Sequence, residues 1–184
     1  MQLRETQSSI FDTTEACGVN VPASEVAKRH VRWMGVSSQR TADGRPIAAL
    51  CDSTPTGQLI DLIVSLCPRE VAHRKFNFVN RVLQDGAGRL RPPTTDELAE
   101  SLPRILRMMR KNRKDIFVFL GNHIRVCLRE AFPESRLEYY QVQTLGGAAN
   151  ALFVHHPSYI RVYRHKHMDE YARKVARLIA ETAL

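Results

Sequence analysis

Residues 152–162 read LFVHHPSYIRV, an apolar run that ends in two histidines, a proline and a serine. An apolar run of this kind is typical of a strand in the core of a sheet, and ligand sites of α/β sheets lie at the carboxyl ends of strands. Pro157 restricts the backbone at this end, so we expect the imidazole of His156 to point into a cleft. The alternative is a strand followed by an ordinary proline turn.

Strands and helices are expected to alternate along the chain. Four short segments rich in Val, Ile, Phe and Leu are expected to be strands: VRWMGVSS (31–38), FNFVNRVL (76–83), DIFVFLG (115–121) and NALFVHH (150–156). Apolar residues spaced three and four apart predict helices at 57–66, at 95–111, after Gly121 and from about 167 to 183. This alternation predicts an α/β protein, a three-layer α/β/α sandwich with a central, mainly parallel four-stranded sheet.

The composition is that of one ordinary globular domain. The 184 residues are 43% hydrophobic and 25% charged, which suits one packed core rather than two. We expect that core over residues 30–184 and an N-terminal extension or helix over 1–29. Lys and Arg outnumber Asp and Glu by 27 to 19, for a net charge of +8, and this bias suits a polyanionic partner.

The cysteines indicate free thiols in a reducing compartment. Cys17, Cys51, Cys67 and Cys127 form no Cys-x-x-Cys pair, so neither a zinc site nor a redox motif is indicated. No apolar run approaches the roughly 20 residues that span a bilayer, and the opening MQLRETQSS lacks the apolar centre of a secretory signal. We therefore expect a soluble, cytoplasmic protein with no metal and no membrane contact.

Polar residues stand at the carboxyl end of each expected strand, where they are expected to converge on one cleft. In chain order these groups are Gly35-Val36-Ser37-Ser38-Gln39, then Asn80, then Gly121-Asn122-His123, and finally His156-Pro157-Ser158. A Gly-Arg-Pro segment, residues 44–46, follows the first group after a short loop. The order and spacing of these parts over roughly residues 30–180 resemble the uracil-DNA glycosylase superfamily.

The resemblance implies a monofunctional DNA glycosylase, which flips a pyrimidine-type base out of DNA and hydrolyses its glycosidic bond to leave an abasic site. It implies a monomer with DNA as its partner and no cofactor. His156 would stabilise the departing base, and the amide of Asn80 would recognise the base edge. The pocket residues would be Gly35, Val36, Ser37, Ser38, Gln39, Ile47 and Asn80.

The sequence also departs from the family pattern. Most members have an acidic residue or Asn near the start of the first loop to activate or orient water, but here Gly35 is followed by Val36, Ser37, Ser38 and Gln39, so this role is vacant or has moved. Asp52 and Asp43 are the nearby carboxylates that could activate water, although each could instead cap a helix or support a turn. Ile47 replaces a Phe that stacks on the base in many relatives, so the base could be uracil or a modified pyrimidine, including a bulky phage-type base. The cysteine spacing of one branch that holds an iron–sulfur cluster is missing, so we expect no cluster.

Contacts to DNA are expected after His156, through residues that can bind phosphate or wedge into a base step. These candidates are Asn122, Ser158, Tyr159, Arg161, Arg164 and Lys166, with Ile160 as a second possible wedge. The basic stretch 104–114 is a second candidate surface, or simply a solvated helix face. Two other functions stay open: a catalytically inactive nucleic-acid-binding relative, because the usual acid is missing, and an unrelated α/β nucleotide-processing enzyme.

Overall fold

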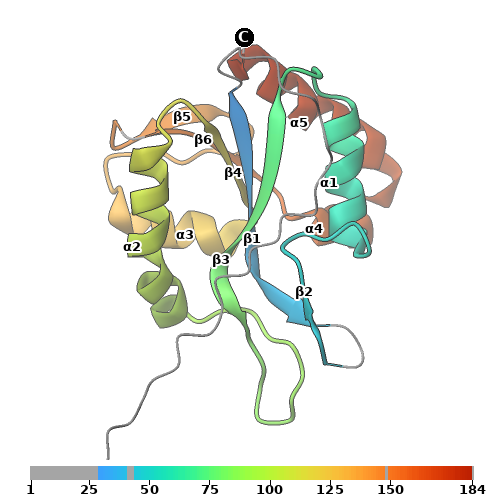
Figure 1. The fold of residues 1–184 in the computed structure, drawn as a ribbon, viewed down its shortest axis with the longest axis vertical. Coiled ribbons are helices and arrows are strands. Elements are labelled where there is room, and N and C mark those ends of the chain that lie inside the picture. Colours follow the sequence, from blue (N-terminus) through green and yellow to red (C-terminus); the bar gives the residue numbers. More distant parts are fainter. Residues whose placement is uncertain (1–28, 41–43, 148, 184) are drawn as a thin grey trace, which may run out of the picture.

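The computed structural model describes residues 29–40, 44–147 and 149–183. Figure 1 shows a twisted sheet between two groups of helices. The strands are β1 (His30–Arg40), β2 (Pro46–Ile47), β3 (Ala72–Val82), β4 (Ile116–Leu120), β5 (Val142–Leu145) and β6 (Ala149–Val154). The helices are α1 (Pro55–Ser65), α2 (Thr95–Lys111), α3 (Asn122–Ala131), α4 (Pro157–Tyr163) and α5 (Met168–Ala183), with a short 3-10 turn at His165–His167.

The main sheet has the order β3-β1-β4-β6-β5, and its first four strands are parallel. These are the four strands predicted from the sequence, and the three-layer sandwich is confirmed. The predicted strand count is too low, because β5 adds an antiparallel edge beside β6 and the two residues of β2 pair with the end of β1. Both additions are short and carry few large apolar residues, so their sequences give no clear strand pattern.

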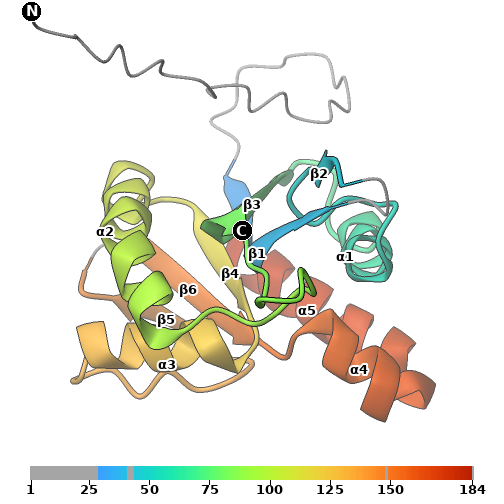
Figure 2. The same ribbon diagram turned by 90° about the horizontal axis from the view of Figure 1, so that it is seen from below.

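The two faces of the sheet are covered by different helices (Figure 2). Alternate residues of β4 point to opposite faces, as they must in a strand. Phe119 packs with α2 and α3, while Val118 packs with α1 and α5. Every residue of β4 is buried, because this strand lies inside the sheet and is covered on both faces. No helix among the described residues combines the length and the apolar character needed to cross a bilayer.

Helix α2 has the predicted bounds, and its start is fixed by a capping box. Thr94 accepts a hydrogen bond from the Glu97 backbone, while the Glu97 side chain accepts one from the Thr94 backbone. Pro103 lies inside the helix without ending it. Glu97 also receives two hydrogen bonds from Arg91, which hold the pKa of its carboxyl at about 2. These contacts fix the loop before α2 against the helix.

Two strand ends differ from the sequence prediction. No helix was predicted directly after His156, but Pro157 occupies the first turn of α4, where its ring fits the helix and its missing N–H costs nothing. Strand β3 continues to Val82, so Asn80 lies within the strand rather than at its end. Both differences change which side chains reach the cleft.

Candidate functional site

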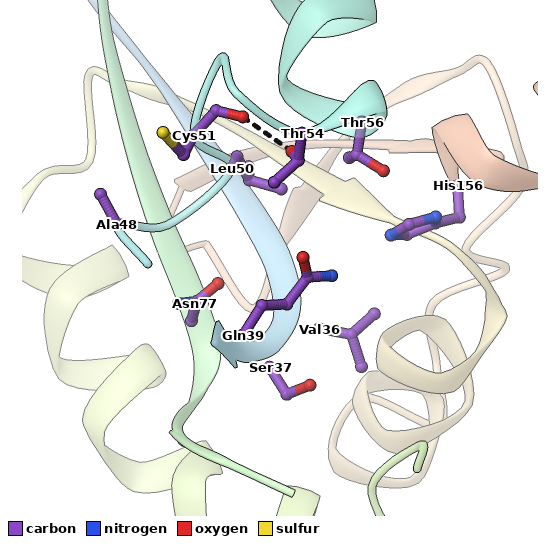
Figure 3. A pocket seen from close by; sticks show the side chains of 10 residues that line it. All are labelled: Val36, Ser37, Gln39, Ala48, Leu50, Cys51, Thr54, Thr56, Asn77 and His156. Atoms are coloured by element: carbon purple, nitrogen blue, oxygen red, sulfur yellow. Dashed lines mark hydrogen bonds between the residues drawn. The ribbon is translucent and has the colours of Figure 1, made fainter. Parts of the chain in front are cut away.

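A pocket lies at the carboxyl ends of β1, β3 and β6 (Figure 3), with about 60 Å³ open to water-sized molecules. Its walls come from β1, β3, the segment between β2 and α1, and the residue before α4. They consist of Val36, Ser37, Gln39, Ala48, Leu50, Cys51, Thr54, Thr56, Asn77 and His156. The sheet edge predicted to hold the site therefore does hold a pocket.

His156 is the N-terminal cap of α4, and its ring orientation is fixed by Ser158. The backbone N–H of Ser158 donates to His156 Nδ1 at 3.2 Å, and the Ser158 hydroxyl lies 2.7 Å from the same nitrogen. Because Nδ1 accepts a backbone hydrogen bond, the proton of the neutral ring must sit on Nε2. Figure 3 shows the ring reaching into the pocket with this far nitrogen foremost. His156 therefore presents one N–H donor to whatever the pocket binds.

The environment keeps His156 neutral. Burial, together with the nearby His123, lowers the pKa of His156 from 6.5 to about 4. A cation here would lose solvation that no carboxylate restores, because no Asp or Glu of the described residues lines the pocket. At neutral pH the group is a hydrogen-bond donor and not a proton source.

Gly121 allows β4 to end directly against His156. Its φ of +89° is in the region that favours glycine, and a Cβ at this position would lie 3.2 Å from the Cβ of His156. The Gly121 N–H donates to the carbonyl of Val154 at 2.9 Å, which ties the end of β4 to the end of β6. The glycine thus lets two strand ends meet closely enough to place the imidazole.

Asn77 provides a buried amide in the same pocket. It is paired in register with Gly35 of β1 and is only 7% exposed. Its Nδ2 donates to Ser38 Oγ at 3.1 Å, which fixes the plane of the amide. A Cβ at Gly35 would come within 3.1 Å of Asn77 Oδ1 and 2.8 Å of Leu50 Cδ2, so the glycine leaves room for this amide.

The start of α1 forms another wall of the pocket. Thr54 Oγ1 donates to the Cys51 carbonyl at 2.7 Å and accepts from the Gly57 N–H at 3.0 Å, which caps the helix. A Cβ at Gly57 would lie 1.8 Å from the Cys51 carbonyl oxygen, so only glycine allows this close turn. The turn presents Cys51, Thr54 and Thr56 to the pocket.

The structure brings together some of the predicted pocket residues and not others. Val36, Ser37, Gln39 and His156 line the pocket, while Gly35 and Ser38 support Asn77 from behind. Asn80 does not line it and is exposed to solvent. The reason is an irregularity in β3: Ser37 pairs with Val79 but Ser38 pairs with Val82, so Asn80 lies in the unpaired, exposed part of the strand beyond Asn77. Asn77 was not among the residues predicted for the site, although a polar residue between two large apolar ones, Phe76 and Phe78, is a sequence signal of a buried polar side chain.

The carboxylate expected to activate water is not found among the pocket-lining residues. Asp52 is exposed and accepts a hydrogen bond from the Cys51 thiol at 3.2 Å; this bond, with one from the Ser53 backbone, lowers the pKa of Asp52. Ile47 lies in β2, outside the pocket lining. Asp43 lies outside the described residues. Within the described ranges, no three His, Cys, Asp or Glu side chains are grouped as metal ligands would be.

The predicted DNA-facing residues lie around α4 and the start of α3. Tyr159, Arg161, Arg164 and Lys166 are exposed, whereas Ile160 is 5% exposed and packs in the core, so it cannot be a wedge. Ser158 is exposed but already bonded to His156. Asn122 begins α3 and accepts hydrogen bonds from Arg125 at 3.2 and 3.3 Å. Of these side chains, that of Ser158 contacts a residue that lines the pocket; the others lie on the segments that follow His156 and Gly121.

The chain matches no protein-family model, and it is not significantly similar to any curated protein searched. What the pocket can do is therefore inferred from its own residues.

Proposed function

We propose that the chain is a monofunctional DNA glycosylase that hydrolyses the glycosidic bond of a pyrimidine-type base turned out of DNA into the pocket. One observation carries the proposal: a neutral His156, held by Ser158, points its Nε2–H donor into the pocket that contains the buried amide of Asn77. The order of motifs that resembles the uracil-DNA glycosylase superfamily supports the same activity.

A neutral donor suits this reaction. When the glycosidic bond breaks, its electron pair leaves with the base, so negative charge develops on the base and positive charge on the sugar. The His156 N–H would stabilise that anion by a hydrogen bond that strengthens as charge develops. Water then adds to the sugar carbon and loses its proton to solvent, while the base takes up a proton after release.

The amide of Asn77 would recognise the base. An amide offers one acceptor and a donor side by side, which matches the paired donor and acceptor on the edge of a pyrimidine. The bond to Ser38 and the close fit against Gly35 and Leu50 hold this amide in place. In this proposal Asn77 takes the role that the sequence assigned to Asn80.

Neutral groups would position the water. Ser37 and Thr56 line the pocket with hydroxyl groups, which can orient water but are too weakly basic to remove its proton; the Thr54 hydroxyl is already bonded in the cap of α1. A reaction in which the base leaves before water attacks needs orientation more than deprotonation. Asp52 is exposed and does not line the pocket, so the proposal gives it no part in positioning water; the role of Asp43 stays a prediction.

The second candidate is a nucleic-acid-binding protein without catalysis. It is favoured by the lack of a carboxylate among the described lining residues. The two functions differ in whether DNA is altered after binding, because hydrolysis leaves an abasic site that alkali cleaves.

The test is to incubate the protein with single- and double-stranded DNA that contains uracil, thymine mispairs, 5-hydroxymethyl or glucosylated pyrimidines, and to identify released bases by mass spectrometry. We expect one of these bases to be released, and His156→Ala to slow release at least about 100-fold. His165→Ala, an exposed histidine of the 3-10 turn, is the matched control. DNA binding without any released base would support the second candidate, and equal rates for the two variants would remove His156 from the mechanism.

A further inference from the structure

Helix α4, which begins directly after the pocket residue His156, exposes a group of large side chains. Tyr159 is 41% exposed, Val162 66% and Tyr163 71%. Tyr159 and Tyr163 are four residues apart, so they lie on the same side of the helix, and their ring centroids are 5.2 Å apart. Single exposed apolar residues are common on protein surfaces. Neighbouring ones on a helix that begins directly after His156 indicate a binding surface.

These two rings stand on a rigid aromatic base. Tyr171 is 6% exposed and donates its hydroxyl to the His155 carbonyl at 2.8 Å. From there, rings in contact lead outward from Tyr140 to His155 at 5.4 Å, and from His155 to Tyr159 at 5.3 Å. His155 is the neighbour of His156, so the row of rings is tied to the pocket. The Tyr159 ring is therefore already held by its neighbours before any ligand binds. A ligand that stacks on it would cost little side-chain conformational entropy.

The surroundings of the rings are basic. Residues 157–168 contain no Asp or Glu, and Arg161, Arg164 and Lys166 in this stretch are exposed. Farther along the row, the Arg125 guanidinium lies 4.6 Å from the Tyr139 ring centroid and Lys174 Nζ lies 4.1 Å from that of Tyr140. Beyond this stretch, Glu170 in the first turn of α5 lies with its Oε2 3.0 Å from Nδ1 of His167. A ligand for this surface would carry flat rings and negative charge.

We propose that this tyrosine face, Tyr159, Val162 and Tyr163 with Arg161, Arg164 and Lys166, binds unpaired bases of single-stranded DNA beside the target nucleotide. Stacking needs a free base face, which a duplex does not offer, and alternating rings and cations are how proteins hold single strands without reading their sequence. The proposal rests on the proposed function for the choice of DNA and deepens it, because it names the single strand as the preferred substrate form.

The test measures binding and not catalysis. A fluorescently labelled 12-nucleotide single strand and its duplex are titrated with the full chain, and affinity is read from anisotropy at several salt concentrations. We expect Tyr159→Ala with Tyr163→Ala to weaken single-strand binding about tenfold or more, to change duplex binding less than about twofold, and to leave the salt slope unchanged. Tyr159→Phe with Tyr163→Phe keeps the rings and should bind like the parent. Leu66→Ala, another exposed apolar residue, is the control for general stickiness.

Each outcome is decisive for the tyrosine face. Parent-like single-strand affinity in the double Ala variant overturns it, and so does an equal loss on both strand forms, which would mark a general DNA contact. Sedimentation showing that the Ala variant converts a dimer to a monomer, with DNA affinity unchanged, would assign the surface to a second copy. Because no base need be released, ring-dependent single-strand binding can be found even if the glycosylase proposal fails. If a base is released but binding of the single strand does not depend on the tyrosine rings, the glycosylase proposal stands and the tyrosine-face proposal is wrong.

Discussion

At the scale of single residues, the protonation state of His156 sets the pH dependence of the proposed reaction. With a pKa of about 4, the ring is the neutral donor throughout the range above pH 5. We expect the single-turnover rate of base release to be flat between about pH 5 and 8 and to fall as the pH drops through 4. An imidazolium that must donate a proton would give the reverse, a rate that falls as the pH rises through 6.5.

Stability must be followed in the same pH range. Because the folded-state pKa of His156 lies below its ordinary value of 6.5, the unfolded chain binds more protons between pH 6.5 and 4. The free energy of unfolding therefore falls as the pH drops through this window, and the contribution of this group is fully present only above it. His73, whose pKa burial also lowers to about 4, acts in the same direction. Circular dichroism at each pH separates loss of fold from loss of activity.

The two asparagines of β3 form a natural matched pair. Asn77→Ala removes the amide from the pocket, so it should reduce base release at least about tenfold and weaken discrimination among bases, because base-edge contacts specify while phosphate contacts hold. Asn80→Ala alters an exposed side chain of the same strand and should behave like the parent. Rates on matched pyrimidine substrates, with DNA affinity measured in parallel, provide the comparison. A larger effect of Asn80→Ala would return the recognition role to the residue that the sequence suggested.

At the scale of elements, the free edge of β3 is held by Arg104 of α2. Its guanidinium Nη2 donates to the carbonyls of Asn77 at 2.9 Å and Phe78 at 2.6 Å. This satisfies two carbonyls of a strand that, among the described residues, pairs with β1 alone, and it fixes the backbone that carries the Asn77 amide. Arg104 therefore has a structural role, which is to hold the backbone of the strand that carries Asn77.

Loss of Arg104 should lower stability as well as activity. Hydrogen bonds from a charged donor typically contribute about 1.5–3 kcal/mol, so Arg104→Gln should reduce the free energy of unfolding in urea by roughly that amount. Arg107→Gln replaces an exposed arginine of the same helix and should change it by less than about 0.5 kcal/mol. Similar values for both variants would show that the two carbonyls are satisfied equally well by water.

Element types could be predicted from the sequence wherever apolar spacing was long and regular. Helix α2 has its predicted bounds because a capping box and a clear helical period agree, and β4 is unmistakable because every residue is apolar. Helix α4 has only seven residues and begins with His-Pro-Ser, which reads equally well as a turn. The pocket residue Asn77 was missed because its identification needs the pairing of β3 with β1, and register is a property of two strands rather than of one sequence segment.

At the scale of the whole molecule, the net charge does not indicate where a polyanion would bind unless the positions of the basic side chains are known. Arg32 is bonded to Asp115 within the fold and Arg91 to Glu97, so part of the positive charge is used internally. The basic stretch 104–114 begins at Arg104, which bonds to the backbone of Asn77, and runs from there to the start of β4 (Figure 1), at the amino ends of the parallel strands and away from the pocket. The exposed cations after His156 are the ones next to the site, and no sequence count could distinguish the two groups.

This placement predicts which cations govern the salt dependence of DNA binding. Each phosphate contact that is lost lowers the log–log slope of affinity against salt by close to one unit, because fewer counterions are released. Arg161→Ala with Arg164→Ala should therefore weaken binding to all sequences and flatten the slope by up to about two units. Arg107→Ala with Arg110→Ala removes the same charge from the far end of α2, so it should leave the slope within about half a unit of the parent. Filter binding from low to moderate salt measures both. If the double variant of Arg107 and Arg110 flattened the slope more than that of Arg161 and Arg164, DNA would bind at the amino ends of the parallel strands. A base held there could not reach His156.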